Sequence, residues 1–322
     1  MKLLVMTDTH IRGTTPGRRM DNFKETLLKK LKEVKQIAIE EEVDFILHGG
    51  DLFDRPDTAP SVVNEFINVL CDYPVPIYLV AGNHDLFGHN PETLPRTMLG
   101  VLVASGVVNL VSEEPILLSK DGIDLQLTGK SFDYEVDSKN TTAYSVKKAE
   151  DVDYALHLVH GMLLERPFFD QGYTLIEDVE TEADLIVVGH YHLGFGKLEF
   201  NGTKFLNPGA LARISADLKE IKRKPQVALV DFKEEIDIQL RELETASKGA
   251  EVLDRSEIED VKFREKKLAN FIREVKATEQ FKVFSSTDIL DKLATNNQLE
   301  SEVVAEARER IGQAQERLGG SN

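Results

Sequence analysis

Short apolar runs alternate with helically spaced apolar stripes through residues 1–240. Residues 3–6, 44–48 and 76–80 are mostly apolar and predict buried strands. Between the first two runs, apolar residues recur at three- and four-residue spacing and predict an amphipathic helix over residues 20–42. A second helix is expected at 62–70, and this alternation is typical of an α/β layered domain. Further strands are expected at 107–111, 125–128, 155–159, 185–188, 196–200, 203–206 and 226–231.

The pattern changes after residue 245. Residues 244–254 include Ser, Lys and Gly and are the most linker-like stretch after the core, so we expect a core domain over 1–245 and a helical extension over 246–322. Apolar residues in the extension are sparse and helically spaced. One run includes Ile258, Val261, Leu268, Ile272 and Val275, and a second, heptad-like run consists of Val304, Ala307, Ile311, Ala314 and Leu318. Two interpretations stay open: helices that fold back on the core, or an element that docks onto a partner helix.

Charge and cysteine content narrow the function classes. The net charge of −17 excludes a generic polycation that coats nucleic acid, although local positive charge or bound metal ions would still permit a nucleic-acid enzyme. The lone cysteine, Cys71, excludes a disulfide framework and a cysteine-built zinc site. The apolar start, residues 1–6, is too short for a signal peptide or membrane span. We therefore expect a soluble, cytoplasmic protein with no membrane association.

Polar residues of metal-ligand type follow five of the expected strands. Because ligands bind at the carboxyl ends of strands in open α/β sheets, these five points can converge on one site. Asp8 and His10, and likewise His190 and His192, are two residues apart and can face the same way in extended chain. The candidate ligands are Asp8, His10, Asp51, Asn83, His160, His190 and His192.

Seven ligands exceed what one ion needs and suit two ions that share a bridging carboxylate. Carboxylate, imidazole and amide donors favour Mn²⁺, with Fe, Zn²⁺ or Mg²⁺ as other options, over soft metals. Any one of these motifs alone would more often belong to a loop or core, but the five in order predict a metal site. Among the other histidines, His48 and His157 are expected to be packed inside, and His89 could reach a substrate.

The pattern D-x-H, G-D, G-N-H-[DE], H and G-H-x-H resembles that of the calcineurin-like metallophosphoesterases. The resemblance implies an αββα sandwich of two mixed sheets flanked by helices. It assigns one ion to Asp8, His10, Asp51 and His192, and the other to Asp51, Asn83, His160 and His190. It also implies that His84 protonates the leaving oxygen and that Asp85 hydrogen-bonds and orients His84.

Within that superfamily, Asp51-Leu52-Phe53-Asp54 followed by Pro60-Ser61 is similar to the SbcD-type DNA repair exonuclease subunits. That resemblance implies a deoxyribonuclease, exonuclease or endonuclease, that acts on DNA with manganese in repair or recombination. It also implies a small DNA-facing cap and a helical tail that binds an SMC-like ATPase of the SbcC type, with a homodimer as a further arrangement. Archaeal and eukaryotic relatives carry a histidine at the position of Asp54, so Asp54 is expected only as a neighbour of the site.

Three function classes compete. A DNA nuclease is favoured by the basic stretch of Arg213, Lys219, Lys222, Arg223 and Lys224, although a solvated charged loop explains those residues equally well. A phosphatase or phosphodiesterase for a small molecule or phosphoprotein is the alternative. The run from Asp51 to Arg55 partly resembles protein phosphatases, but those enzymes have glutamate where Asp85 stands and glycine where Pro56 stands. A noncatalytic scaffold is disfavoured because every ligand position is filled.

Overall fold

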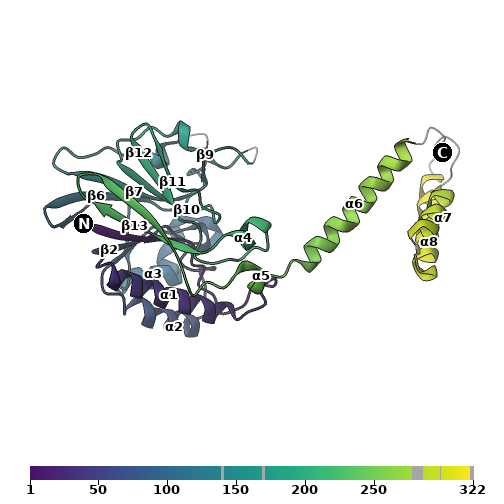
Figure 1. Cartoon of the computed structure of the whole chain (residues 1–322), viewed down its shortest axis with the longest axis horizontal. Helices are drawn as coiled ribbons and strands as arrows, with labels where there is room; N and C mark the ends of the chain where they lie inside the picture. Colours follow the sequence, from purple (N-terminus) through teal and green to yellow (C-terminus); the bar gives the residue numbers. More distant parts are fainter. Residues whose placement is uncertain (139–140, 169–170, 278–285, 298, 320–322) are drawn as a thin grey trace. The chain divides into compact units, whose positions relative to one another are not determined.

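The computed structural model describes residues 1–138, 141–168, 171–277, 286–297 and 299–319. The chain divides into two compact units, Met1–Arg255 and Ser256–Asn322 (Figure 1). The first unit contains two six-stranded sheets, and each mixes parallel and antiparallel neighbours. The predicted class, two mixed sheets flanked by helices, is confirmed. The two predicted domains, 1–245 and 246–322, stay predictions.

The first sheet places β1 at its centre, parallel to β2 and antiparallel to β13. In spatial order its strands are β14 (Ile236–Glu242), β13 (Gln226–Phe232), β1 (Lys2–Met6), β2 (Phe45–His48), β3 (Ile77–Leu79) and β4 (Asn109–Leu110). The second sheet has β10 and β7 side by side and parallel. Its order is β11 (Gly196–Phe200), β12 (Thr203–Asn207), β10 (Leu185–His190), β7 (Tyr154–Gly161), β6 (Ile123–Lys130) and β5 (Ile116–Lys120).

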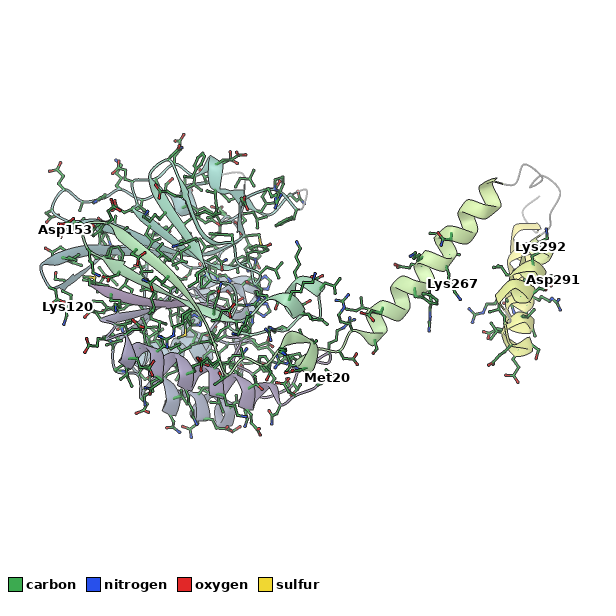
Figure 2. The ribbon with its side chains drawn as sticks, in the orientation of Figure 1. Met20, Lys120, Asp153, Lys267, Asp291 and Lys292 are labelled. Carbon is green, nitrogen blue, oxygen red and sulfur yellow. The ribbon has the colours of Figure 1, made fainter. Side chains whose placement is uncertain are left out.

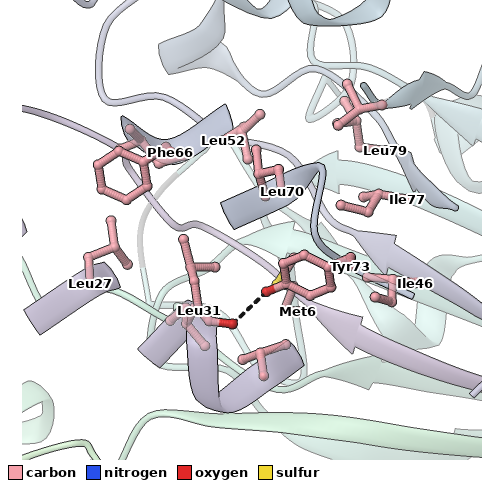
Figure 3. Packing of buried hydrophobic residues seen from close by; sticks show 14 of the residues in the cluster. Met6, Leu27, Leu31, Ile46, Leu52, Phe66, Leu70, Tyr73, Ile77 and Leu79 are labelled. Carbon is pink, nitrogen blue, oxygen red and sulfur yellow. Dashed lines mark hydrogen bonds between the residues drawn. The ribbon is translucent and has the colours of Figure 1, made fainter. Parts of the chain in front are cut away.

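Alternation along β1 shows how the layers are built. Leu4 and Met6 pack into a cluster with the helices, whereas Leu3 and Val5 pack into a cluster between the two sheets. Successive side chains of a strand point to opposite faces, so one strand serves both cores. Figure 3 shows part of the helix-side cluster, where the Tyr73 hydroxyl donates to the Leu31 carbonyl at 2.8 Å.

The first helical layer consists of α1 (Phe23–Glu40), α2 (Pro60–Leu70) and α3 (Met98–Ala104). α1 starts at Phe23 and not at the expected residue 20, because the Asn22 side chain accepts a hydrogen bond from the Glu25 backbone N–H and caps the helix. The outer face of the second sheet packs a third cluster against short elements. Those elements are η4 (Thr141–Tyr144), η5 (Ile176–Asp178) and β8 (Leu163–Leu164), which pairs in parallel with β9 (Thr174–Leu175).

Residues 244–254, expected to be a linker, instead pack on the first unit. Ala246 and Leu253 are buried, and α5 (Gly249–Val252) forms within the stretch. The Glu33 carboxylate also accepts hydrogen bonds from the backbone N–H groups of residues 244 and 245. A run of small and polar residues forms a linker only when no neighbouring side chain packs on a domain. Here apolar side chains towards both ends of the run are buried against the first unit. The strands β5 and β14 and the helix α3 were not expected from the sequence.

The second unit contains α6 (Ser256–Ala277), α7 (Ser286–Asn297) and α8 (Ser301–Gly319). Figure 2 shows charged side chains along these helices, including Lys267 and Asp291. Asp291 of α7 pairs with Arg308 of α8 at 2.7 Å. The side chains of Val261, Ile272, Val275, Ala314 and Leu318, named in the two apolar runs, lie outside those described. Within the described part of the chain, no helix is long and apolar enough to span a bilayer.

Candidate metal centre

Four of the seven predicted ligands have left-handed backbone conformations. The φ angle is 50° at Asp8, 47° at His10, 52° at Asp51 and 77° at His190. Non-glycine residues adopt this region rarely, because Cβ crowds the backbone, and each instance costs about 1–3 kcal/mol. All four lie at or just after the end of a strand. The surrounding fold therefore sustains backbone strain where the candidate ligands gather, as functional sites commonly do.

One group of side chains, Asp8, His10, Asp51 and His192, has ligand atoms that all lie within 4.8 Å of one another. His10 Nε2 lies 3.0 Å from His192 Nε2 and 3.7 Å from Asp51 Oδ2. His192 Nε2 lies 3.6 Å from Asp8 Oδ1. The first three side chains are buried, whereas the His192 side chain is 31% exposed. This group therefore has one open side.

A second group consists of Asp51, His160 and His190. His160 Nε2 lies 3.4 Å from Asp51 Oδ2 and 3.2 Å from Asn83 Oδ1. Asp51 thus belongs to both groups, which places its carboxylate between them. Together the two groups and Asn83 bring all seven predicted ligands to one place, from the ends of strands in both sheets.

The hydrogen bonds of His160 test whether these residues fit a cation. Its Nδ1–H donates to the Gly49 carbonyl at 2.8 Å, which directs Nε2 at two acceptor oxygens, Asn83 Oδ1 and Asp51 Oδ2. Asp51 Oδ2 and His10 Nδ1 are buried without a hydrogen-bond partner among the described residues. A buried carboxylate oxygen without a hydrogen-bond partner, set among imidazole nitrogens and an amide oxygen, is a donor set that suits a divalent cation.

The pKa values of the candidate ligands differ from one side chain to the next. Burial alone would raise the pKa of Asp51, but His160, His10 and His84 outweigh it and hold that pKa well below its usual range. Burial lowers the pKa of His190 to about 3, with help from His160, and also lowers the pKa of His10. Burial lowers the pKa of His160 too, but the Asp51 carboxylate outweighs burial and raises it to about 9. Asp51 is therefore ionised beside two neutral imidazoles, His10 and His190, as metal binding requires, whereas the His160 ring must lose a proton before it can bind a metal ion.

Glycines let the strand ends approach one another closely. A Cβ on Gly82 would lie 2.1 Å from Asp51 Oδ1, and a Cβ on Gly189 would lie 2.1 Å from the Gly49 carbonyl oxygen. Neither position has room for another residue. Gly82 therefore lets the loop after β3 lie against the loop after β2 of the same sheet, and Gly189 lets β10 of the second sheet approach the end of β2 in the first.

His84 lies exposed at the edge of this site. Its backbone N–H donates to Asp51 Oδ1 at 2.8 Å, and its ring Nδ1 donates to the Asp54 carbonyl at 3.0 Å. Its ring stands edge-on to the His10 ring, with 4.8 Å between centroids. These contacts fix the ring and leave its other nitrogen, Nε2, for proton exchange.

The expected contact between Asp85 and His84 is wrong. The Asp85 carboxylate accepts from the backbone N–H groups of Leu52, Phe53 and Gly82, at 3.2, 2.8 and 2.9 Å. Asp85 ends the one-turn helix η1 (Asn83–Asp85), and its side chain turns back to cap that helix, away from the His84 ring. Burial raises the pKa of Asp85 to about 7. Asp85 thus ties the β2 and β3 loops together, and the Asp54 carbonyl orients His84.

Residues 210–213, which we name the ligand strap, run beside the candidate ligands. The backbone N–H groups of Ala210 and Ala212 donate to the carbonyls of His192 and Asp8, at 2.9 and 3.2 Å. On its other side, the strap presents four successive carbonyls to cations. Arg223 donates to residues 210 and 212 at 2.6 and 3.0 Å, the Lys30 ammonium to residue 211 at 2.7 Å, and Arg19 to residue 213 at 2.9 Å.

These contacts correct the interpretation of the basic stretch. Arg213 is buried and donates to the carbonyls of Arg223 and Ser247, while Arg223 holds the strap and pairs with Glu220 at 2.9 Å. Lys224 pairs with Glu242 at 2.7 Å. The two arginines are therefore structural, neither free to bind phosphate nor part of a solvated loop. Only Lys219 and Lys222 of the stretch remain exposed without an acidic partner among the described residues.

The remaining histidines behave largely as expected. His48 is buried between the Thr9 hydroxyl and the Gly50 N–H, and His157 lies between the Thr128 hydroxyl and the Ala143 carbonyl. Sequence reasoning missed Arg12, which pairs with Asp54 at 2.9 Å beside His10. Its position two residues after His10 was the available signal.

Comparisons with known proteins agree with this geometry. Residues 1–194 match the calcineurin-like phosphoesterase family. The DNA double-strand break repair protein Mre11 of Thermoplasma acidophilum is 27% identical over 195 residues, 58% of this chain and 50% of that protein. Mre11 of Sulfolobus acidocaldarius is 23% identical over 262 residues, 80% of this chain and 61% of that protein. The chain thus spans about half to three fifths of the length of these relatives.

Among solved structures, a dimetal phosphatase from Danio rerio aligns with a TM-score of 0.46 and 11% identity, over 75% of this chain and 96% of that one. The family match covers 194 of the 322 residues and includes all five strand-end motifs. The chain therefore belongs to the calcineurin-like phosphoesterase family, the metal-dependent enzymes that hydrolyse phosphoester bonds, and it is similar to the Mre11 DNA double-strand break repair proteins.

Proposed function

We propose that this chain is a metal-dependent phosphodiesterase that cuts DNA, a nuclease subunit in DNA end processing, repair or recombination. The observation that carries the proposal is the Asp51 carboxylate shared by two groups of ligand side chains. Such an arrangement suits a pair of ions, which clamp a phosphate in an in-line displacement. Similarity to proteins named for DNA double-strand break repair supports DNA as the substrate.

Two divalent ions, most simply Mn²⁺, would be held by the seven ligands. One set would be Asp8, His10, Asp51 and His192, and the other would be Asp51, Asn83, His160 and His190. When bound, the ions supply Lewis-acid stabilisation of the phosphate and a water nucleophile at neutral pH. Fe, Zn²⁺ and Mg²⁺ suit the same donor types to differing degrees.

Other side chains of the protein orient the ligands and would supply a proton to the leaving group. The Thr7 hydroxyl and the His190 backbone N–H both donate to the Asp8 carboxylate, at 2.6 and 3.1 Å, and hold it in one orientation. His84, fixed through Nδ1, presents Nε2 to protonate the leaving oxygen of the substrate. The Asp85 carboxylate holds the two loops that carry Asp51 and Asn83.

The second unit is our candidate for binding an SMC-like ATPase or a second copy of the chain. Phe263 and Leu268 of α6 are each 59% exposed, and Val303 of α8 is 51% exposed. In the heptad-like run of α8, Val304, Ala307 and Ile311 are half-buried. A narrow apolar stripe of this kind gains most by packing into a groove of another helix pair.

A phosphatase remains the second candidate, and one observation favours it. A pocket of about 260 Å³ is lined by both His84 and Arg55, so a guanidinium lies near the proposed general acid. However, Arg55 pairs with Asp57 at 2.9 Å, which leaves it less available to grip a phosphate. We therefore place this function second.

The test compares three substrates with Mn²⁺: end-labelled linear DNA, an aryl phosphodiester and the corresponding aryl phosphomonoester. We expect the chain to cut the DNA and the diester, and His84→Ala to lose most of both activities. Hydrolysis of the monoester alone would support the phosphatase. Failure to hydrolyse any of the three with each candidate metal would overturn the proposal.

A further inference from the structure

Phe132 joins the metal centre to the molecular surface. Its ring centroid lies 5.7 Å from that of His190 and 6.3 Å from that of His160, so it packs against two candidate ligands. Its backbone N–H donates to the Ala81 carbonyl at 2.9 Å, and the Ser131 hydroxyl accepts from the Ala81 N–H at 2.9 Å. The loop after β6 is therefore tied to the chain just before Asn83.

Aromatic rings continue outward from Phe132. The His89 ring stands edge-on to Phe132 with 5.8 Å between centroids, and it lies 6.5 Å from the Tyr134 ring at a tilt of 39°. Tyr134 is 70% exposed, and its hydroxyl donates to the Gly88 carbonyl. We name Phe132, His89 and Tyr134 the aromatic track. It runs from the ligands to solvent, and both loops that carry it are anchored by hydrogen bonds.

The position of this track suggests what it contacts. One sugar joins a nucleobase to its phosphate, so a phosphate held beside His160 and His190 leaves its base within reach of Phe132. Aromatic side chains stack on bases whatever the sequence, because every base presents a π-face. An exposed tyrosine in a row of rings that leads away from the candidate ligands therefore suits a nucleotide chain.

We propose that the aromatic track stacks the nucleobase beside the scissile phosphate, so that the site selects nucleotide diesters over diesters without a base. The inference rests on the proposed function and narrows its substrate class. Base selection would then come from stacking and not from base-edge hydrogen bonds, so cleavage should tolerate any sequence.

The first experiment measures selectivity with one leaving group. Thymidine 5′-(p-nitrophenyl phosphate) and methyl p-nitrophenyl phosphate both release p-nitrophenol. They differ only in the second ester group, which is a thymidine in the first and a methyl group, without a base, in the other. Tyr134→Ala should lower the ratio of their kcat/KM values about tenfold, within the range that loss of one base stack produces. Tyr134→Phe keeps the ring and should keep the ratio. Phe200→Ala removes an exposed aromatic of β11 and serves as the matched control.

The second experiment measures binding without turnover. In the His84→Ala background, fluorescence anisotropy compares an oligothymidylate with an abasic oligonucleotide of the same length. We expect tighter binding of the oligothymidylate, and Tyr134→Ala should remove most of the difference. Equal affinity for the two strands, or a difference that survives the Tyr134 substitution, would overturn the inference. If the wild-type chain hydrolyses neither ester, the proposed function fails, and the binding comparison still decides the role of the track.

Discussion

Over the described residues, the two units of the chain differ in how far they bury their apolar side chains and in whether they hold strained backbone. Met1–Arg255 buries most of its large apolar side chains, chiefly in three clusters, and holds several non-glycine residues at positive φ. In Ser256–Asn322, Leu290 is the only large apolar side chain that is buried among those the structure describes, and the others are half-buried or exposed. Strained backbone persists only where surrounding contacts over-determine it. The candidate chemistry therefore lies in the unit whose packing can sustain strained backbone, and the second unit has the exposed apolar side chains on which the proposed partner binding rests.

Removal of the shared carboxylate should have the largest effect. Asp51→Ala deletes the one side chain common to both ligand groups, so we expect loss of both ions and of measurable turnover. Elemental analysis of the loaded protein should show two ions per chain for the wild type and far fewer for the variant. Asp72→Ala, which removes an exposed carboxylate, is the control. At most one ion in fully loaded wild-type protein would contradict the shared site.

Loss of the general acid should be the next largest effect. His84→Ala should keep both ions but lower turnover by about 10²–10⁴-fold, the usual contribution of general acid catalysis. His192→Ala should instead weaken metal binding, because its ring belongs to a ligand group. Metal titration beside steady-state kinetics separates the two. Equal metal loss in both variants would make His84 a ligand.

Release of the ligand strap should have a smaller effect. Lys30→Met removes the cation on the Leu211 carbonyl while it keeps an apolar chain in the core. The strap holds the backbone of Asp8 and His192, and small shifts of catalytic groups cost up to about a hundredfold, so we expect a ten- to hundredfold loss of kcat. Circular dichroism should show a folded protein, and Lys32→Met on the same helix should behave as wild type. A wild-type rate for Lys30→Met would show that the strap does not position the ligands.

Removal of the second unit should affect the chemistry least. A chain that ends at Arg255 keeps all three apolar clusters and every candidate ligand. We expect an unchanged melting temperature, metal content and rate on an aryl phosphodiester, but loss of binding to an SMC-like ATPase or to a second copy. Calorimetry and size-exclusion chromatography measure these outcomes. A large drop in melting temperature, with no partner found for either form, would favour helices that stabilise the core.

The sequence was a better guide to which side chains lie together at the candidate site than to the elements around it. Apolar runs marked the strands, and residues of metal-ligand type stood directly after them in the sequence. Because the carboxyl ends of parallel strands meet at one edge of a sheet, these residues could be expected to lie together even before the strand order was known. Asp85 was misassigned because neighbouring residues of a short helical turn point in different directions. β14 was missed because its apolar residues alternate with exposed charged and polar ones, as on a sheet edge.

Charged residues were the other source of error. Arg213 and Arg223 carry the same charge whether they face solvent or a buried carbonyl. Their spacing in the sequence does not distinguish these two environments. Lys30 did offer a signal, since it lies on the apolar face of α1 between Leu27 and Leu31. A lysine at such a position must find acceptors inside the protein, because burial without them is costly. Burial indeed lowers the pKa of Lys30 well below its usual value.

The left-handed backbone conformation of several candidate ligands has a consequence for the stability of the protein. Glycine adopts positive φ without penalty, so glycine at Asp8, His10 or His190 would relax the backbone of the apoprotein while it removed a proposed metal ligand. At Asp8, however, glycine would also leave the Thr7 hydroxyl and the His190 backbone N–H without their acceptor. Relief of backbone strain at one ligand therefore competes with the loss of contacts that its side chain makes in the protein interior.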